Sequence, residues 1–324
     1  MSTETMKAAT ARRYGGPEVM VIETLPRPVA RPGQLLIKTA AFGVTRGDAR
    51  IRGLDVPRGM GLLLRLIFGV TRPRRPVPGR EFAGVVAALG DGVTGWSVGD
   101  AVMGITPGMS LSAGAEYCAV PADGCLARRP ETLTPEEAAG TFFGLLTAAD
   151  FLLDQAKLRP GDRVLINGAS GAVGIAATWL ASHAGAQVTA VCSPANHDFA
   201  RSYGADRTAD YTRPLPEGPY DVILDVAGTL PYPQAKPLLA GGGRLALITA
   251  DPKGQLGANL RPRRGTHRLL AGATKESPAA LTRALAFHAQ GYRSPITALP
   301  LTDIQQAHQH ASTGHKRGNI VVTL

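Results

Sequence analysis

The sequence predicts an α/β protein in which a mostly β region precedes a doubly wound parallel sheet. Up to Val120, some six or seven short strand-like segments are separated by Gly/Pro turns, which is an all-β pattern. From Thr134 to Gly241, helical and strand-like segments alternate, as they do in parallel sheets with crossover helices. The helical part begins with Thr134 as N-cap, Pro135 at the first helical position and Glu137 closing a capping box.

The clearest single unit is a strand–turn–helix–strand segment from Arg163 to Ser193. A short apolar run, a glycine turn, an Ala- and Leu-rich helix and a β-branched strand follow one another: Val164–Ile166, Gly168–Gly174, Ile175–His183 and Gln187–Cys192. This is the pattern of a βαβ unit.

The glycine turn predicts a dinucleotide site. A helix that starts there directs unpaired N–H groups and its positive dipole end toward the turn, and glycines let a pyrophosphate approach the backbone. The spacing is G-x-x-G-x-x-G and not the more familiar G-x-G-x-x-G, so a ligand-free turn that packs a helix on a sheet is the alternative. The complete βαβ context favours the dinucleotide.

The end of the second strand favours NADPH over NAD. NAD-selective sites usually offer Asp or Glu there to the ribose diol. This chain has Cys192–His197 at that place, with no carboxylate before Asp198 and with the basic Arg201 nearby. A hydroxyl, an amide and a cation suit a 2′-phosphate, although an inward-pointing Asp198 would reverse the preference.

The composition gives no indication of a nucleic-acid-binding or membrane protein. The 324 residues allow two domains, and 44% hydrophobic with 19% charged residues is an ordinary globular composition. The net charge is +10, but no run of five basic residues occurs, so nucleic acid is not expected as a partner. No apolar stretch of 18 residues and no signal-like N-terminus occur, so no membrane association is expected. Three scattered cysteines indicate a reducing compartment, and we expect a cytoplasmic protein.

Two regions of the β part are candidates for substrate binding. Thr45 and Asp48 follow the buried strand-like segment Gln34–Phe42, where polar side chains can face a cleft, although both can instead cap a helix that starts there. The segment Leu54–Pro76 surrounds an apolar patch, Leu62–Val70. It is either a helix packed on the core or a lip over an apolar substrate.

Seven stretches carry a family resemblance. They are AAFGVTRGDARIRG (40–53), PGREFAGVVAALGDGVTGWSVGDAVMG (78–104), FGLLTA (143–148), NGASGAVG (167–174), VCSPANHDFARSYGADRTADYT (191–212), DVILDVAG (221–228) and HKRGNIVV (315–322). In their order and end-to-end coverage the chain resembles the zinc-independent quinone oxidoreductase branch of the medium-chain dehydrogenase/reductase superfamily.

The resemblance implies a domain plan. It implies a GroES-like, mostly β catalytic domain over 1–123 and 290–324, and a Rossmann NADP(H)-binding domain over 124–289. In relatives the last Rossmann strand, here expected at Arg268–Ala273, pairs with its copy, which implies a homodimer.

Two departures from the zinc alcohol dehydrogenases exclude their metal chemistry. Those enzymes have Cys and His after the early strand and a Gly-His-Glu in the segment that matches Gly79-Arg80-Glu81. Here Thr45 and Arg80 stand at these places, and a guanidinium stays protonated and cannot ligate a metal. Three cysteines also cannot form the four-cysteine lobe for structural zinc. We therefore expect no metal.

Without a metal to stabilise an alkoxide, the expected reaction is hydride transfer from NADPH to a quinone or an α,β-unsaturated carbonyl, which spreads the arriving charge itself. The family pattern has Asn and Asp where Thr45 and Asp48 stand. The resemblance implies that Thr45 is a smaller hydrogen-bond donor than the Asn of the family. It also implies that Asp48 holds the site in shape and that Arg52 is an electrophilic aid to the reaction. Tyr117 is expected to have a structural role. His308 and His310 are expected to lie on the surface.

The resemblance also implies the cofactor contacts. Thr147 is expected on the nicotinamide side, and Ser170, Gly171, Ala172 and Val173 at the pyrophosphate, within the turn from Gly168 to Gly174. Ser193, Asn196 and Tyr211 are expected around the 2′-phosphate. The strand end Val226–Gly228 is expected at the adenosine or ribose, and the strand end Ile248, Thr249 and Ala250 at the nicotinamide. Lys316, Arg317 and Asn319 are added from near the C-terminus, although Lys316 and Arg317 can instead form a solvated turn.

Two alternatives remain open. An enoyl-thioester reductase would need an open basic groove for a carrier phosphopantetheine or CoA, and a tyrosine donor that the sequence does not identify. A non-catalytic NADPH-binding protein would carry the same cofactor motifs, and only turnover separates it from an enzyme.

Overall fold

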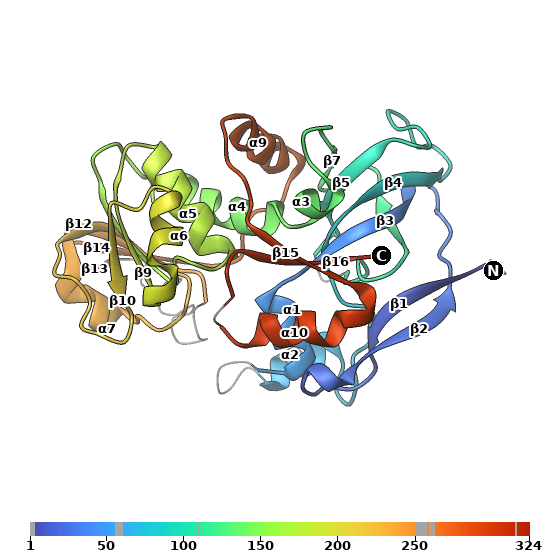
Figure 1. The fold of residues 1–324 in the computed structure, drawn as a ribbon, viewed down its shortest axis with the longest axis horizontal. Helices are drawn as coiled ribbons and strands as arrows, with labels where there is room; N and C mark the ends of the chain where they lie inside the picture. Colours follow the sequence, from blue (N-terminus) through green and yellow to red (C-terminus); the bar gives the residue numbers. More distant parts are fainter. Residues whose placement is uncertain (1–3, 56–60, 109, 250–257, 259–262, 315) are drawn as a thin grey trace. The chain divides into compact units, whose positions relative to one another are not determined.

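The computed structural model describes residues 4–55, 61–108, 110–249, 258, 263–314 and 316–324 (Figure 1). The chain divides into two compact units, Met1–Phe142 with Glu276–Leu324, and Phe143–Lys275. We refer to them as the first and the second unit, and we describe each by itself.

The first unit is built on antiparallel sheets. Its main sheet has the order β15-β16-β3-β4-β5-β7, with β6 also paired to β3, and β1 and β2 form a separate two-stranded sheet. The strands are β1 (Thr5–Ala11), β2 (Met20–Pro26), β3 (Gln34–Val44), β4 (Glu81–Leu89), β5 (Ala101–Ile105), β6 (Tyr117–Pro121), β7 (Leu126–Arg128), β15 (Ile296–Pro300) and β16 (Asn319–Thr323).

Strand β3 is the centre of this sheet. It pairs with β4, β6 and β16, so its backbone is covered along its length and its side chains are almost continuously buried. Phe42 of β3 and Phe82 of β4 face each other in register and are fully buried in the core of the unit. The helices of this unit are α1 (Arg46–Gly53), α2 (Gly61–Phe68), α3 (Pro135–Ala139), α9 (Pro278–Ala289) and α10 (Ile304–Ser312).

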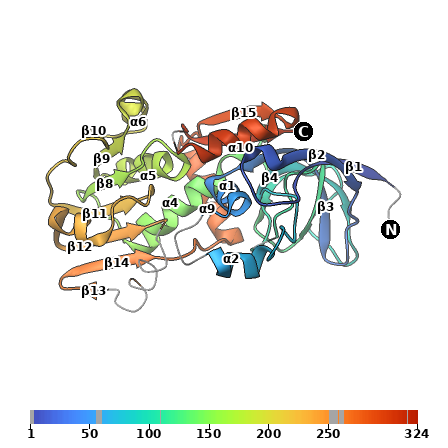
Figure 2. The same ribbon diagram turned by 90° about the horizontal axis from the view of Figure 1, so that it is seen from below.

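The second unit is a parallel sheet with crossover helices, in the strand order β10-β9-β8-β11-β12-β14-β13 (Figure 2). All neighbours are parallel except the short β13. The strands are β8 (Arg163–Asn167), β9 (Gln187–Cys192), β10 (Arg207–Asp210), β11 (Tyr220–Asp225), β12 (Leu239–Leu247), β13 (Arg263–Arg264) and β14 (His267–Ala271). The helices are α4 (Phe142–Ala149), which continues as a π-helix (Asp150–Gln155), α5 (Ala172–His183), α6 (His197–Ser202) and α7 (Tyr232–Ala235).

The predicted fold class is confirmed in both units. The expected βαβ segment is β8, α5 and β9, and the predicted capping box is present, since Thr134 N–H donates to Glu137 and Glu137 N–H to the Thr134 hydroxyl. Among the described helices, none has the length and apolar character needed to cross a bilayer.

The unit boundaries differ from those expected at 123/124 and 289/290. The expected linker Pro121–Pro130 contains β7, which hydrogen-bonds to β5, and α3 packs on β3 and β4. Helix α9 packs near β7, and the His288 ring lies 3.2 Å from the Thr132 hydroxyl. Both helices therefore belong to the first unit, because their apolar faces are covered by its sheet.

Candidate functional site

Three consecutive residues at the start of β4 hold three separate segments of the first unit. The Gly79 N–H donates to the Asp48 carboxylate (3.1 Å), and the Arg80 guanidinium makes a two-pronged ion pair with Glu276 (2.6 and 3.0 Å). The buried Glu81 carboxylate accepts the Phe142 N–H. Gly79 has φ +88°, a conformation that favours glycine. The tripeptide thus fixes α1, the segment before α9 and Phe142, the last residue of the first stretch of this unit, around one point.

Asp48 and Thr45 form a closed set of hydrogen bonds at the start of α1. The Asp48 carboxylate accepts the Thr45 N–H (2.8 Å) and the Thr45 hydroxyl (2.6 Å), and its other oxygen accepts the Gly79 N–H. The Asp48 N–H is 3.3 Å from the Thr45 oxygen, which completes a capping box. Both residues therefore have the helix-capping role, and Asp48 in addition anchors β4 to the helix. The Thr45 proton is already engaged by Asp48.

Arg52 is buried on the same helix, with only 6% of its surface exposed. Its Nε donates to the Gly15 carbonyl (3.2 Å) and its Nη2 to the Ser312 hydroxyl (3.1 Å). Its Nη1 is covered and has no hydrogen-bond partner among the described residues. The guanidinium thus ties α1 to α10 and keeps one donor uncommitted.

The expectation that His308 lies on the surface is wrong. His308 is completely buried on α10, and neither ring nitrogen has a hydrogen-bond partner within the described part of the chain. Burial, with Arg52 acting in the same direction and Asp48 against it, lowers the pKa of His308 to about 4, so the ring is neutral near pH 7. Ile304, Ala307 and Ala311 form the buried stripe of this helix, and this spacing would have placed position 308 on the same face. His310 is half-buried.

A small hollow of about 20 Å³ lies beside Asp48 and Arg52, and it has room for about one water molecule. Its wall is otherwise mainly apolar, with Ile51, Leu111 and the prolines 73, 76 and 78 among its lining residues. Asp48 and Arg52, two of the three predicted catalytic residues, thus line a cavity of the first unit.

Helix α2 lies within the segment Leu54–Pro76, for which a helix packed on the core and a lip over an apolar substrate were the two expectations. Phe68 is buried, but Leu66, Ile67 and Val70 are about half exposed at 54%, 44% and 51%. The helix therefore packs on the unit through Phe68 while it leaves apolar side chains in the open.

The three residues near the C-terminus have different surroundings. Asn319 is buried and donates to the Ser294 hydroxyl (2.7 Å), while Arg317 is exposed. Lys316 is half-buried, and its pKa is lowered to about 8 by burial, against the opposing influence of Asp48 and Glu81. Lys316 thus shares its electrostatic environment with the Asp48 site.

The glycine turn of the second unit has the geometry of a phosphate cradle. Gly168 has φ +88°, and a Cβ on Gly174 would lie 2.1 Å from the Gly168 carbonyl oxygen, so both positions require glycine. A Cβ on Gly171 would meet nothing closer than 3.8 Å, and no side chain caps the start of α5 there. The first N–H groups of α5, at Ala172, Val173 and Gly174, have no acceptor within the helix. The residues present therefore fit the pyrophosphate of a dinucleotide.

A network that the sequence analysis missed fixes the carboxyl ends of β8 and β11. The Asn167 side-chain amide donates to the buried Asp225 carboxylate (2.8 Å), which also accepts the N–H groups of Gly228 and Leu230 (both 2.9 Å). Gly228 has φ +78°. The network shapes the Val226–Gly228 turn beside the glycine cradle.

The remaining predicted contacts lie at the same edge of the sheet or on α4. The Thr249 hydroxyl donates to the Val226 carbonyl (3.2 Å) and the Ile248 N–H to the Asp225 carbonyl (3.0 Å). Thr147 is buried on α4, where its hydroxyl donates to the Phe143 carbonyl and accepts from Thr274 (3.2 Å). Ala250 lies outside the described residues.

At the end of β9, the Asn196 amide donates to the Ser193 hydroxyl (3.1 Å). The Asp198 carboxylate is 99% exposed and pairs with Arg201 (2.8 Å), so it does not point inward. Asp210 ends the neighbouring β10 opposite Cys192, and its pKa is lowered chiefly by the Thr212 N–H. Tyr211 is 49% exposed.

Two family models match the chain over much of its length. Residues 31–131 match the alcohol dehydrogenase GroES-like domain, and residues 203–322 match the zinc-binding dehydrogenase model. A quinone oxidoreductase from Sus scrofa is 29% identical over 332 residues, covering 97% of this chain and 95% of that protein. The chain belongs to the medium-chain dehydrogenase/reductase superfamily and is quinone-oxidoreductase-like. It is an oxidoreductase of a superfamily that uses a nicotinamide cofactor.

A solved structure and a further relative are also similar to this chain. The quinone oxidoreductase of Coxiella burnetii superposes with a TM-score of 0.88 at 26% identity, over 99% of this chain and all of that one. A trans-enoyl reductase from Aspergillus niger is 32% identical over 225 residues, which cover 62% of this chain and 56% of that protein.

Arg80, which the sequence resemblance aligns with a histidine of the zinc alcohol dehydrogenases, is held in the ion pair with Glu276. Across the residues that the structure describes, no three His, Cys, Asp or Glu side chains are grouped as metal ligands would be.

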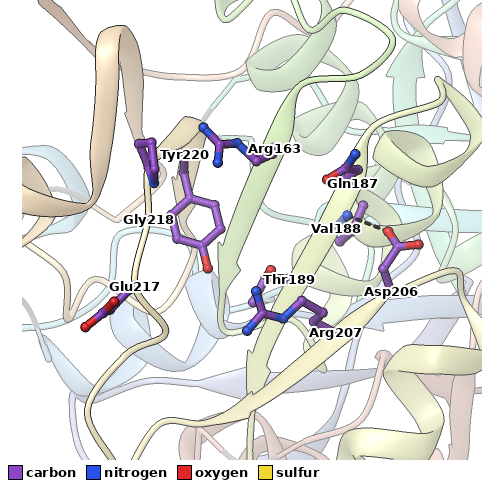
Figure 3. A pocket seen from close by; sticks show the side chains of 10 residues that line it. Arg163, Gln187, Val188, Thr189, Asp206, Arg207, Glu217, Gly218 and Tyr220 are labelled. Atoms are coloured by element: carbon purple, nitrogen blue, oxygen red, sulfur yellow. Dashed lines mark hydrogen bonds between the residues drawn. The ribbon is translucent and has the colours of Figure 1, made fainter.

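The Rossmann unit of this dehydrogenase-like chain has another pocket, of about 350 Å³, at the amino ends of β8 to β11 (Figure 3). Arg163, Thr189 and Tyr220 line it, and the Asp206 carboxylate at its wall accepts the Val188 N–H (2.7 Å). Ligands of open parallel sheets bind at the carboxyl ends. This pocket lies at the opposite edge from the glycine cradle and is not the dinucleotide site.

We predict that Asp48→Asn lowers the free energy of unfolding by about 1–3 kcal/mol, because an amide NH₂ would meet the donors that the carboxylate now accepts. Urea unfolding at pH 7 measures the change. Asp55→Asn is the matched control, since that carboxylate is 74% exposed and its loss should cost less than about 0.5 kcal/mol. Equal effects of the two substitutions would contradict the anchoring role of Asp48.

A second prediction concerns pH. The folded pKa of His308, about 4, lies below the ordinary value of about 6.5, so protons favour the unfolded chain. Stability is complete above pH 6.5 and is lost as the pH falls toward 4, by about 2 kcal/mol at pH 5. His308→Leu should remove this part of the loss between pH 7 and 5 in urea unfolding, whereas His310→Gln should retain it. An unchanged slope in His308→Leu would disprove the assignment.

Proposed function

We propose that the protein is an NADPH-dependent, metal-free reductase that transfers hydride to quinones or α,β-unsaturated carbonyls. The observation that carries the proposal is the Arg80–Glu276 ion pair at the place of the zinc-ligand histidine. A guanidinium held by a carboxylate at 2.6 Å supplies no lone pair to a metal, so the residues at this place do not support alkoxide stabilisation by zinc.

The residues of the second unit would hold the dinucleotide. The N–H groups at the start of α5 would bind the pyrophosphate, and the turn from Val226 to Gly228 the ribose. When bound, the cofactor supplies a hydride, which a conjugated acceptor takes up without metal assistance because its π-system carries the charge to oxygen.

The first unit would hold the acceptor. Because the Thr45 proton is committed to Asp48, the buried Arg52 guanidinium would stabilise charge on the acceptor oxygen through its positive charge. Asp48 would act as a positioning residue through its bonds to α1 and β4.

The end of β9 supports NADPH over NADH. Ser193 and Asn196 offer a hydroxyl and an amide, and the nearest chain carboxylate, Asp198, is directed outward and neutralised by Arg201. Asp210 opposes this preference, but its carboxylate is bound by the Thr212 N–H and lies 4.0 Å from Arg213. The three buried cysteines are free, which supports the proposal of a reducing, cytoplasmic setting.

An enoyl-thioester reductase is the second candidate. The relative from Aspergillus niger is named a trans-enoyl reductase, and its similarity covers 62% of this chain. An enoyl thioester is itself an α,β-unsaturated carbonyl, so the same hydride chemistry would serve both candidates.

The purified, metal-stripped protein should oxidise NADPH with 9,10-phenanthrenequinone or trans-2-hexenal, followed at the nicotinamide absorbance. NADPH should be preferred over NADH at least tenfold in kcat/KM, about 1.4 kcal/mol. Ser193→Asp should abolish the preference, because a carboxylate would repel the 2′-phosphate. Ser202→Asp, which adds the same charge on α6, should leave it unchanged. Binding of NADPH without turnover of any acceptor would establish the binding-protein alternative instead.

We also propose that the protein forms a homodimer through β14, the last parallel strand of the second unit. Among the described residues, β13 covers β14 at His267 and Arg268 alone, and β14 continues from there to Ala271. Light scattering after size exclusion should give twice the 33.8 kDa chain mass at micromolar concentration. A monomer mass at this concentration would refute the dimer.

A further inference from the structure

The pocket of about 350 Å³ at the amino ends of β8 to β11 is a candidate for a second ligand site (Figure 3). It lies at the opposite edge of the sheet from the glycine cradle, so a bound dinucleotide would not occupy it. Its volume is in the range of pockets that hold a small ligand. The side chains that line it are therefore available to a ligand of a different kind.

Tyr220 has a buried hydroxyl group without a partner. The residue is 3% exposed, and its hydroxyl forms no hydrogen bond within the described part of the chain. Buried polar groups nearly always have a partner, so a hydroxyl that lacks one at a pocket wall indicates that a ligand supplies it. Figure 3 shows this hydroxyl directed toward Thr189 and the guanidinium of Arg207.

The strand pairing places these three side chains on one face of the sheet. Arg207 of β10 is in register with Thr189 of β9, Thr189 with Leu165 of β8, and Leu165 with Ile223 of β11. Residues in register on neighbouring strands point to the same face. Tyr220 packs in the same buried cluster as Leu165 and Ile223, because the register of β11 shifts directly after it. A guanidinium and two hydroxyls from three strands therefore share one end of the pocket.

The pocket contains charges of both signs, and one charge of each sign is unmatched. Arg163 lies 3.9 Å from the Asp221 carboxylate, and the Asp206 carboxylate accepts a backbone N–H (2.7 Å). Arg207 and Glu217 are exposed, and neither forms an ion pair among the residues that the structure describes. The pocket thus offers one free cation and one free anion.

The two unmatched charges lie on different sides of the pocket. In Figure 3 the Tyr220 ring stands between Glu217 and Arg207, with its hydroxyl on the side of Arg207. The Arg207 end offers donors, and a guanidinium binds a carboxylate through two parallel N–H groups. The ionised Glu217 carboxylate offers acceptors alone, which suit an ammonium group. A phosphate fits less well, because it would bring a second negative charge toward Asp206 and Glu217.

Close backbone contacts hold the wall of the pocket in shape. The Val188 N–H donates to the Asp206 carboxylate (2.7 Å), and the Asp206 N–H donates to the Val188 carbonyl (3.0 Å). A Cβ on Gly218 would lie 2.4 Å from the Leu238 carbonyl oxygen, so the segment after Glu217 packs closely on its neighbour. A preformed wall lowers the entropy cost of binding a ligand.

We propose that this pocket binds a small zwitterion of the ω-amino acid class, a free molecule with a carboxylate at one end and an ammonium group at the other. Arg207, Thr189 and Tyr220 bind the carboxylate, which gives the Tyr220 hydroxyl the acceptor that it lacks. Glu217 binds the ammonium group. The site is separate from the dinucleotide cradle, and binding at it requires neither the cofactor nor the acceptor of the proposed reductase.

Titration calorimetry of the full chain at pH 7 tests the site with simple probes. Glycine, 4-aminobutyrate and 6-aminohexanoate vary the distance between the two charges, and butyrate and n-butylamine each carry one of them. The best of the three zwitterions should bind at least tenfold more tightly than either single-charge probe. Zwitterions that bind no more tightly than butyrate and n-butylamine, or that do not bind, would overturn the assignment.

Substitutions assign the two ends of the ligand. Arg207→Ala should remove the advantage of the best zwitterion over n-butylamine, and Glu217→Gln should remove its advantage over butyrate. Arg213→Ala and Glu131→Gln change the same charges at exposed positions that do not line the pocket, and they should bind the zwitterion as the wild type does. Equal losses in these controls would reduce the effect to overall charge and contradict the site.

Tyr220→Phe separates ligand binding from a structural role. The substitution removes a hydroxyl that has no partner to lose within the described residues, so the midpoint of urea unfolding without ligand should not fall. The dissociation constant of the best zwitterion should rise at least threefold, whereas that of n-butylamine, which has no carboxylate, should stay the same. An unchanged dissociation constant for the zwitterion would refute the role of the hydroxyl and with it the site.

Discussion

The hydrogen bond from Gly79 to Asp48 is the constraint on which the first unit's site depends. It joins the start of β4 to the start of α1, and the next two residues extend the same junction to Glu276 and Phe142. Because both Asp48 and Glu81 are buried carboxylates, loss of the groups that donate to them would leave an unpaired charge in the interior. Arg80 stands between them in the sequence, and its charge is matched by the Glu276 carboxylate.

The second unit was predictable because its signals are local. Strand β8, the glycine turn, α5 and β9 follow one another, and each is specified by its own residues, so the order of these elements was predicted correctly. The Asn167–Asp225 bond was not predictable, since it depends on the register between β8 and β11, which are 58 residues apart. The direction of Asp198 also required the structure, for a different reason: its pairing with Arg201 is local, but nothing in the sequence excludes an inward rotamer.

The first unit was predicted less completely because its elements are joined by long-range pairing. Thr45 and Asp48 were recognised from their place after β3, yet only the structure shows that their hydrogen-bonding capacity is largely used in capping α1. Strand β7 has three residues and no strand signal of its own, and it exists because β5 offers an open edge. His308 was misplaced because its neighbours on α10 are polar, although the small apolar residues at Ile304, Ala307 and Ala311 define a buried face.

Arg52 and His308 together give the candidate site its electrostatic character. A protonated His308 would place a second, desolvated positive charge beside Arg52. Burial lowers the pKa of His308 and keeps the ring neutral. Arg52 therefore remains a buried cation with two of its nitrogens satisfied by Gly15 and Ser312, and one without a partner among the described residues. An unpaired buried donor costs about 1–3 kcal/mol, and a developing negative charge on an acceptor oxygen would recover that cost.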